Sequence, residues 1–345
     1  PPTVEGFMAT LGGPTVLHQP GRDRGRSRGV SVLLHGNEPS SIRALHDWLR
    51  SGETPAVDAV CFVGAVAAAR VPPGFAHRAR AGGRDLNRCF RPPWDGADGA
   101  VAAEALQLLR QAGCEALVDL HNNTGHNPAY GVGTGADAAR LNLATLFAER
   151  YVVYDLALGA LIEATATDFP SVAIECGRAG DPAADAVARA GLARYLRADR
   201  LETRQLLAVH MEVFGSPVRV VLLPGLRVAF GDRPVAGADL TLLADIDRHN
   251  FQPLLPGVPV GCLAPGTPWP LDARGANGEE VSHDVFEVVD ALLRTRRGIV
   301  PIMMTTDPTP LTGEEMEIAI RNLPRDAETI ALYKKMADQG PLPAR

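Results

Sequence analysis

The sequence predicts an α/β fold, in which a mixed, mainly parallel sheet is flanked by helices and followed by a smaller C-terminal β-rich domain. Up to about residue 207, short apolar or β-branched runs alternate with stretches rich in Ala, Leu and Arg. This alternation is typical of strands that follow helices along an α/β chain. From residue 208 onward, short runs are instead interrupted by Pro and Gly, as in a small β domain. We therefore expect two domains, 1–207 and 208–345.

Strands and helices alternate in order along the first domain. The expected strands are 29–34, 57–66, 114–120, 151–156 and 171–176, and the expected helices are 39–50, 98–112, 137–150 and 181–207. Pro39 suits the first turn of a helix, where its missing N–H costs nothing. In the second domain, Thr312 and Glu315 have the spacing of a capping box. We therefore expect a helical tail after the β-rich part.

Composition indicates a globular protein that binds neither nucleic acid nor membrane. The chain has 345 residues, 46% hydrophobic and 21% charged, which is enough for two domains with cores. The net charge is −6, and the arginines at 22, 24, 26 and 28 are interpreted as a solvated loop. No apolar stretch approaches the roughly 20 residues that span a bilayer, and the start does not resemble a signal peptide. We expect a cytoplasmic protein whose five cysteines, none in a CxxC pair, are reduced thiols.

Two metal-ligand residues follow the first strong strand. His35 comes directly after the apolar run 30–34, at the carboxyl end of a strand where ligand sites of open α/β sheets collect. Glu38 follows three residues later, and a tight strand-to-helix turn can bring both side chains to one ion. On its own, an HxxE sequence is more often a surface turn with incidental polar residues.

The same pattern recurs at two further strands. His121 ends the apolar run 116–120, and together with His35 and Glu38 it makes a three-ligand set that leaves zinc one open position. Glu175 ends a third predicted strand, where it suits a general base, although a capping or salt-bridged carboxylate has the same sequence signal. These residues predict a catalytic zinc site with Glu175 beside it.

An arginine-rich segment lies between these strands. Residues 77–93 contain five arginines and Asn87 without helical or strand periodicity. Arginine forks suit carboxylate recognition and oxyanion stabilisation. A solvated basic loop is an equally good interpretation from sequence alone.

Four motifs in register resemble the succinylglutamate desuccinylase/aspartoacylase family of the zinc carboxypeptidase clan. They are HGNE at 35–38, RDLNR at 84–88, DLHN at 119–122 and IECG at 174–177, and they cover roughly 30–178. The resemblance implies a zinc-carboxypeptidase-like fold and one zinc ion per chain, bound by His35, Glu38 and His121. It also implies an enzyme that hydrolyses linear amide bonds.

The resemblance further implies a role for each remaining motif residue. Glu175 is the expected base and acid, and Arg80, five residues ahead of Asp85, polarises the scissile carbonyl. Asn87 and Arg88 hold the substrate carboxylate. Asn122, which we also count among the substrate-binding residues, orients the site with Asp85.

The function expected from this resemblance is a zinc-dependent deacylase that acts on a small N-acyl amino acid. Zinc would lower the pKa of water to about 7, and Glu175 would take its proton and pass one to the leaving amine. A carboxypeptidase acting on peptides, or a metal-binding homologue without turnover, stays open. A homo-oligomer is compatible with the sequence.

Two departures from aspartoacylases bear on the substrate. Position 165, where they carry an arginine for a second carboxylate, is Thr here, and 156–175 contains no Lys or Arg. Beyond residue 195 the chain has only Tyr333 to match their C-terminal tyrosine. With Glu163 and Asp168 in that segment, we expect a product whose side chain is neutral or cationic, unless an arginine from elsewhere reads a second carboxylate.

Overall fold

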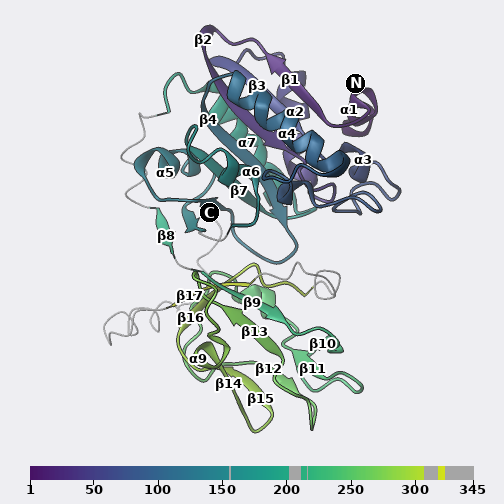
Figure 1. Cartoon of the computed structure of the whole chain (residues 1–345), viewed down its shortest axis with the longest axis vertical. Helices are drawn as coiled ribbons and strands as arrows, with labels where there is room; N and C mark the ends of the chain where they lie inside the picture. Colours follow the sequence, from purple (N-terminus) through teal and green to yellow (C-terminus); the bar gives the residue numbers. More distant parts are fainter. Residues whose placement is uncertain (155–156, 202–210, 216, 307–317, 323–345) are drawn as a thin grey trace. The chain divides into compact units, whose positions relative to one another are not determined.

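The chain forms two compact units in a computed structural model that describes residues 1–154, 157–201, 211–215, 217–306 and 318–322 (Figure 1). The first unit comprises residues 1–123 and 129–214, and the second comprises residues 124–128 and the chain from 215 onward. The boundary expected between residues 207 and 208 falls within 202–210, which lies outside the described residues.

An eight-stranded mixed sheet is the centre of the first unit. Its strands are β1 (Thr15–Gln19), β2 (Asp23–Val32), β3 (Val57–Val63), β4 (Cys114–Asn123), β5 (Tyr130–Gly133), β6 (Arg150–Val153), β7 (Ser171–Arg178) and β8 (Glu212–Phe214). They lie in the order β1-β3-β2-β4-β7-β5-β6-β8. Only the β1–β3 and β5–β7 pairs are antiparallel among these described strands. The predicted mixed, mainly parallel sheet is thus confirmed.

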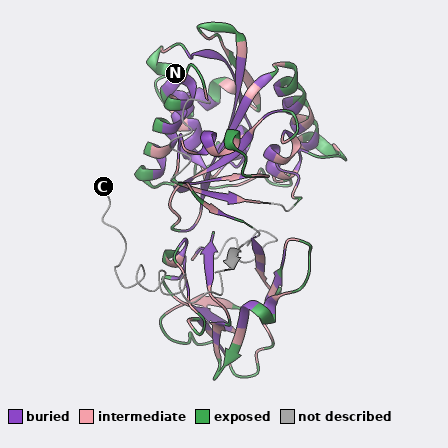
Figure 2. Ribbon diagram, turned by 90° about the vertical axis from the view of Figure 1, so that its left-hand side faces the viewer, coloured by how far each residue is buried: buried purple, intermediate pink, exposed green. Residues whose placement is uncertain are grey.

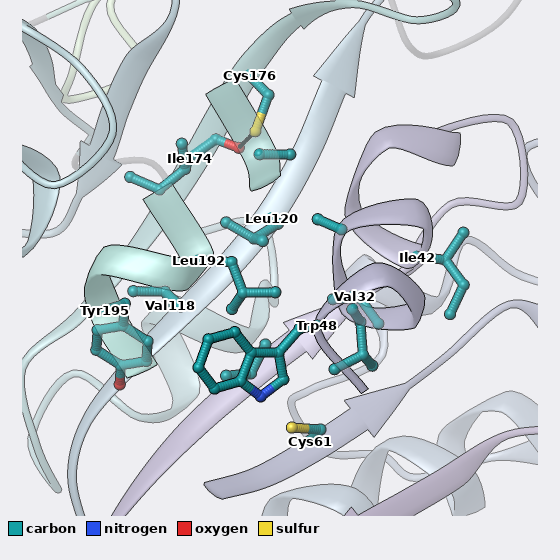
Figure 3. Packing of buried hydrophobic residues seen from close by; sticks show 14 of the residues in the cluster. Val32, Ile42, Trp48, Cys61, Val118, Leu120, Ile174, Cys176, Leu192 and Tyr195 are labelled. Carbon is teal, nitrogen blue, oxygen red and sulfur yellow. Dashed lines mark hydrogen bonds between the residues drawn. The ribbon is translucent and has the colours of Figure 1, made fainter. Parts of the chain in front are cut away.

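Helices cover both faces of this sheet, as the strands with two buried faces require. They are α1 (Val4–Leu11), α2 (Pro39–Ser51), α3 (Val66–Ala69), α4 (Gly96–Gln111), α5 (Ala138–Ala144), α6 (Leu161–Ala164) and α7 (Pro182–Arg197). On one face, Ile42 of α2 and Leu192 of α7 pack with Leu120 of β4 (Figure 3). On the other face, α4 packs Leu106 and Leu109 onto β3 and β4. In Figure 2 the central strands are coloured as buried, and the exposed residues of the helices face outward.

The arginine-rich run before residue 29 is a strand, so the expected solvated loop is wrong. β2 begins at Asp23, and the Arg28 side chain is fully buried. Its Nε donates to Glu115 Oε1 at 2.6 Å, and Nη1 donates to the carbonyls of Tyr195 and Ala198, both at 2.6 Å. These protein acceptors replace the water that would otherwise solvate the guanidinium. The Arg28 side chain can therefore be buried although it is charged.

The second unit is built from two sheets over one core. A five-stranded sheet has the order β10-β11-β12-β15-β14 and a four-stranded sheet has the order β13-β9-β17-β16. The strands are β9 (Val218–Leu222), β10 (Val228–Phe230), β11 (Leu240–Leu242), β12 (Pro259–Leu263), β13 (Leu271–Arg274), β14 (Phe286–Val289), β15 (Leu292–Thr295), β16 (Ile299–Ile302) and β17 (Ile318–Asn322). The described residues of this unit also include a short α-helix, α9 (Ser282–Val285), and a 3₁₀ helix, η3 (Ile246–His249). Val220, Leu240 and Leu293 belong to the shared core. The β-rich character is confirmed.

Most of the expected helical tail lies outside the described residues. Thr312 and Glu315 lie outside the described residues, but Ile318–Asn322 is strand β17. It pairs with β16 and β9 on either side. Backbone pairing on both edges outweighs the local helical signal, as tertiary context commonly does.

Residues 124–128 leave the first unit and fold with the second, directly after β4. The backbone N–H of His126 donates to Asp247 at 3.3 Å, and the N–H of Met303 donates to the Asn127 side chain at 3.1 Å. A Cβ on Gly125 would lie 1.9 Å from the Met304 carbonyl oxygen, so only glycine fits there. In the described part of the chain, no helix is long and apolar enough to cross a membrane.

Candidate metal and catalytic site

His35 and Glu38 lie in the turn that joins β2 to α2. The turn begins with Leu33 in the left-handed region, at φ 57°, and Glu38 occupies the N-cap position of α2, with Pro39 in the first helical turn. His35 Nδ1 lies 2.7 Å from Glu38 Oε1. The tight turn therefore points both side chains at the same place.

His121 completes a buried group of three metal-ligand side chains. It lies near the end of β4, next to β2 in the sheet, and its Nδ1 is 2.9 Å from Glu38 Oε2. One ligand atom from each of His35, Glu38 and His121 lies within 4.8 Å of the others. All three residues are 3–5% exposed. The structure thus brings together the three residues that the sequence predicts as zinc ligands.

The outer nitrogen of each imidazole is held by a carboxylate. His35 Nε2 lies 3.0 Å from Asp85 Oδ1, and His121 Nε2 lies 2.9 Å from Asp119 Oδ2. A histidine whose far nitrogen faces a carboxylate has its other nitrogen fixed toward a metal, an arrangement common around zinc. Two inward-facing Nδ1 atoms and one carboxylate therefore fit a zinc ion with an open position.

Electrostatics in the metal-ligand group favour a cation. Burial raises the pKa of Glu38, but His35 and His121 outweigh it and hold that pKa well below its ordinary value. Burial lowers the pKa of His121, but Asp119 and Glu38 together raise it well above its ordinary value. Without a metal, a proton is thus favoured on the imidazole, where a cation would compete with it.

Glu175 stands beside the metal-ligand group on the neighbouring strand. It pairs in register with His121 across the parallel β4–β7 ladder, so the two side chains lie on the same face. Its Oε2 is inaccessible and has no hydrogen-bond partner. Burial, with a smaller contribution from Glu38, raises the pKa of Glu175 to about 7, against the opposing effect of His121. A carboxylate with that pKa suits a general base at neutral pH.

Arg78, rather than Arg80, lies at the metal-ligand group. Arg78 donates to Asp85 Oδ2 from Nε at 3.1 Å and from Nη2 at 2.8 Å, and its Nη1 is 3.6 Å from Glu38 Oε1. The Arg80 guanidinium is nearly half exposed and pairs with Asp98 at 3.3 Å. Sequence spacing pointed to Arg80, and no sequence signal separates two arginines two residues apart in a loop.

The predicted substrate residues differ in what they can offer. Asn87 is buried, and its side-chain oxygen accepts from the backbone N–H of Leu161 at 3.0 Å, so its NH₂ group is the part that can donate to a ligand. Arg88 follows it in the same 3₁₀ turn, Leu86–Arg88, with Nη1 donating to the Asn87 carbonyl at 3.1 Å.

Asn122 is engaged in holding the site together. Its side-chain oxygen accepts from the N–H of Ser40 in α2 at 3.0 Å, and its NH₂ donates to the Gly177 carbonyl of β7 at 3.1 Å. Its backbone N–H donates to Glu38 Oε2 at 3.1 Å. With 3% exposure, Asn122 fits the expected orienting role better than substrate contact.

Glu163 and Asp168, whose charge was the reason to expect a product with a neutral or cationic side chain, both have partners within the protein. Glu163 accepts from the backbone N–H groups of Leu158 at 3.0 Å and Gly159 at 2.7 Å. Asp168 pairs with Arg110 at 2.8 Å. Neither side chain presents an unpaired negative charge to a substrate, so this reason for excluding a dicarboxylic product fails.

The fold and the site define a class: an α/β protein with a candidate single-metal site at the carboxyl edge of a mixed sheet. Residues 30–198 match the succinylglutamate desuccinylase/aspartoacylase catalytic domain. The domain that holds the site therefore belongs to the succinylglutamate desuccinylase/aspartoacylase family. No curated protein sequence matches the chain.

Solved structures of similar fold include three bacterial proteins. A succinylglutamate desuccinylase/aspartoacylase from Rhodobacter sphaeroides has 16% identity and a TM-score of 0.58, with 90% of this chain and 88% of that chain covered. The product-bound ectoine utilization protein EutE (DoeB) from Ruegeria pomeroyi has 17% identity, a TM-score of 0.57 and the same coverage. The succinylglutamate desuccinylase from Chromobacterium violaceum has 14% identity and a TM-score of 0.55, covering 88% and 87%. At these identities the likeness shows the fold.

Proposed function

We propose that the protein is a zinc-dependent amidohydrolase that removes the acyl group from a small N-acyl amino acid. The observation that carries this proposal is the buried group of His35, Glu38 and His121 with Glu175 in register beside it. A zinc ion bound there would act as a Lewis acid and lower the pKa of water to about 7. Membership of the family supports an acyl amide as the bond that is cut.

The chain's own residues divide the remaining work. Glu175, with its raised pKa, takes a proton from water and returns one to the leaving amine nitrogen. We assign the polarisation of the scissile carbonyl to Arg78 in preference to Arg80, because Arg78 lies at the metal-ligand group. The Asn87 amide and Arg88 would bind the substrate carboxylate as donors.

The first test is metal content and turnover. We expect one zinc per chain by elemental analysis, lost in His121→Ala, and hydrolysis in a screen of N-acetylated amino acids with acidic, neutral and cationic side chains. Full zinc occupancy in His121→Ala would refute the ligand set. Cleavage of peptides alone would indicate a carboxypeptidase, and zinc binding without any turnover would indicate a silent homologue.

The arginine assignment has a matched pair of variants. Arg78→Lys should raise the barrier for kcat/KM by about 2.7–4 kcal/mol, the typical cost of losing an oxyanion donor. Arg80→Lys, two residues away, should leave kcat/KM near the wild-type value because its partner is Asp98. The reverse outcome would return the role to Arg80.

A further inference from the structure

Tyr130 is a buried tyrosine directly opposite Glu175. In the antiparallel β5–β7 ladder, Tyr130 and Glu175 are register partners, and two steps along it Val132 pairs with Ala173. Directly opposite residues of an antiparallel pair point to the same face, with Cβ atoms about 4.5–5.5 Å apart. Because Glu175 is also in register with His121, the three residues form a row across β4, β7 and β5.

Burial and charge around the Tyr130 side chain suit a hydrogen-bond donor. The residue is 1% exposed. Burial, reinforced by Glu175, Tyr154 and Glu38, raises the pKa of Tyr130 well above its ordinary value, so the hydroxyl keeps its proton. A phenylalanine would fill nearly the same volume, and a buried tyrosine hydroxyl ordinarily serves a polar partner.

Glu175 in turn needs a hydrogen-bond donor. Its Oε2 is an inaccessible carboxylate oxygen without a partner, and such an oxygen is costly to leave unsatisfied. A base that must face a reacting water needs one fixed orientation. Tyr130 can fix that orientation, because β5 lies on the side of β7 away from β4 and His121.

We propose that Tyr130 is the positioning residue for Glu175, with its hydroxyl donating to the Glu175 carboxylate through one bridging water. This inference rests on the proposed function for its catalytic consequence. It adds a residue from β5, a four-residue strand that carries no metal ligand, to the machinery of the site.

The kinetic test is a double-mutant cycle on the zinc-loaded full chain. Tyr130→Phe should lower kcat by roughly 10–100-fold, as loss of an orienting partner does, with KM and zinc content unchanged. In the Glu175→Gln background the same change should have no further effect, because Tyr130 acts through Glu175. Wild-type kcat in Tyr130→Phe, or full additivity in the double variant, would overturn the inference.

Tyr151→Phe is the matched control. Tyr151 is another buried tyrosine of the same sheet, in β6, and its hydroxyl donates to the Gly135 carbonyl at 2.7 Å. Its variant should keep the wild-type kcat. An equal fall in both variants would show that any lost tyrosine hydroxyl weakens the sheet, and would refute a specific role for Tyr130.

A binding measurement separates this inference from the proposed function. Acetohydroxamate gives up a proton when it chelates a metal, and a neighbouring carboxylate receives that proton. Calorimetry should therefore show weaker acetohydroxamate binding in Tyr130→Phe, still weaker binding in Glu175→Gln, and no further loss in the double variant. If no N-acyl amino acid is hydrolysed, the proposed function fails while this cycle still tests Tyr130. Equal affinity in Tyr130→Phe and wild type would refute the inference.

Discussion

The two ends of strands β2 and β4 both carry buried charge, but only the amino end is balanced. There, Arg28 pairs with Glu115 at 2.6 Å, and Arg26 pairs with Glu115 at 3.3 Å and with Asp23 at 2.9 Å. Two arginines meet two carboxylates. The arginines and carboxylates at the amino end are thus paired with one another.

At the carboxyl end, acids outnumber permanent cations. Glu38, Asp85, Asp119 and Glu175 surround the two histidines, with Arg78 as the permanent cation bonded there. Oδ1 of Asp119 and Oε2 of Glu175 lack hydrogen-bond partners. The comparison teaches that a buried charge cluster is structural when its charges cancel, and points to a missing cation when they do not.

The largest effect on activity is expected when one acid at the carboxyl end is neutralised. Glu175→Gln keeps the shape of the side chain but removes the proton acceptor. Turnover should fall by roughly 10²–10⁴-fold, while zinc content and melting temperature stay close to wild type. Kinetics and elemental analysis on the same preparation check this. Near-normal turnover would show that another group is the base.

At the amino end, the matching change should affect stability and leave the site intact. Arg28→Met removes one partner of a buried pair, which typically costs about 3–5 kcal/mol of unfolding free energy. Zinc content should be unchanged. The control is Arg24→Met, whose half-exposed pair with Asp58 should be worth about 0–1 kcal/mol. Urea unfolding measures both, and equal losses would contradict the assignment.

A smaller effect should follow from loosening one histidine. Asp119→Asn keeps the size of the side chain that faces His121 Nε2 but removes its charge. Zinc affinity should fall by roughly 10–100-fold, as for other outer carboxylates of zinc histidines. Competition with a coloured chelator measures it, and unchanged affinity would show that the carboxylate does not support the ligand.

The pH dependence refines the comparison further. Glu175 works as a base only when deprotonated, so kcat/KM should fall about tenfold per pH unit below its pKa, which is about 7 without metal. A bound dication favours the ionised form of Glu175. In the zinc-loaded enzyme, the apparent pKa of the acidic limb of the kcat/KM profile should therefore lie below about 7. The raised pKa of His121 means that zinc binding releases a proton and weakens in acid. Calorimetry in buffers of different ionisation enthalpy measures the proton release.

The sequence predicted that His35, Glu38 and His121 come together, because strand ends and helix starts meet at one edge of a parallel sheet. His35 and His121 each follow an apolar run and Glu38 lies three residues after His35, so the pattern predicts this convergence. Arg28 was misjudged because Glu115, its partner, lies 87 residues away. Tyr130 was missed because its four-residue strand inserts antiparallel beside β7, which no local period indicates.

Residues 124–128 belong to the second unit although they lie within the sequence of the first, and this limits how the C-terminal domain can be exchanged by gene fusion. The chain passes into that unit twice, first three residues after His121 and again at residue 215. A gene fusion that replaced only the sequence after 214 would leave Gly125 and Asn127 without the Met304 and Met303 backbone they fit. A new C-terminal domain could therefore be inherited only together with a matching five-residue segment. Its two ends are joined, within the first unit, to the strand of His121 and to the strand of Tyr130.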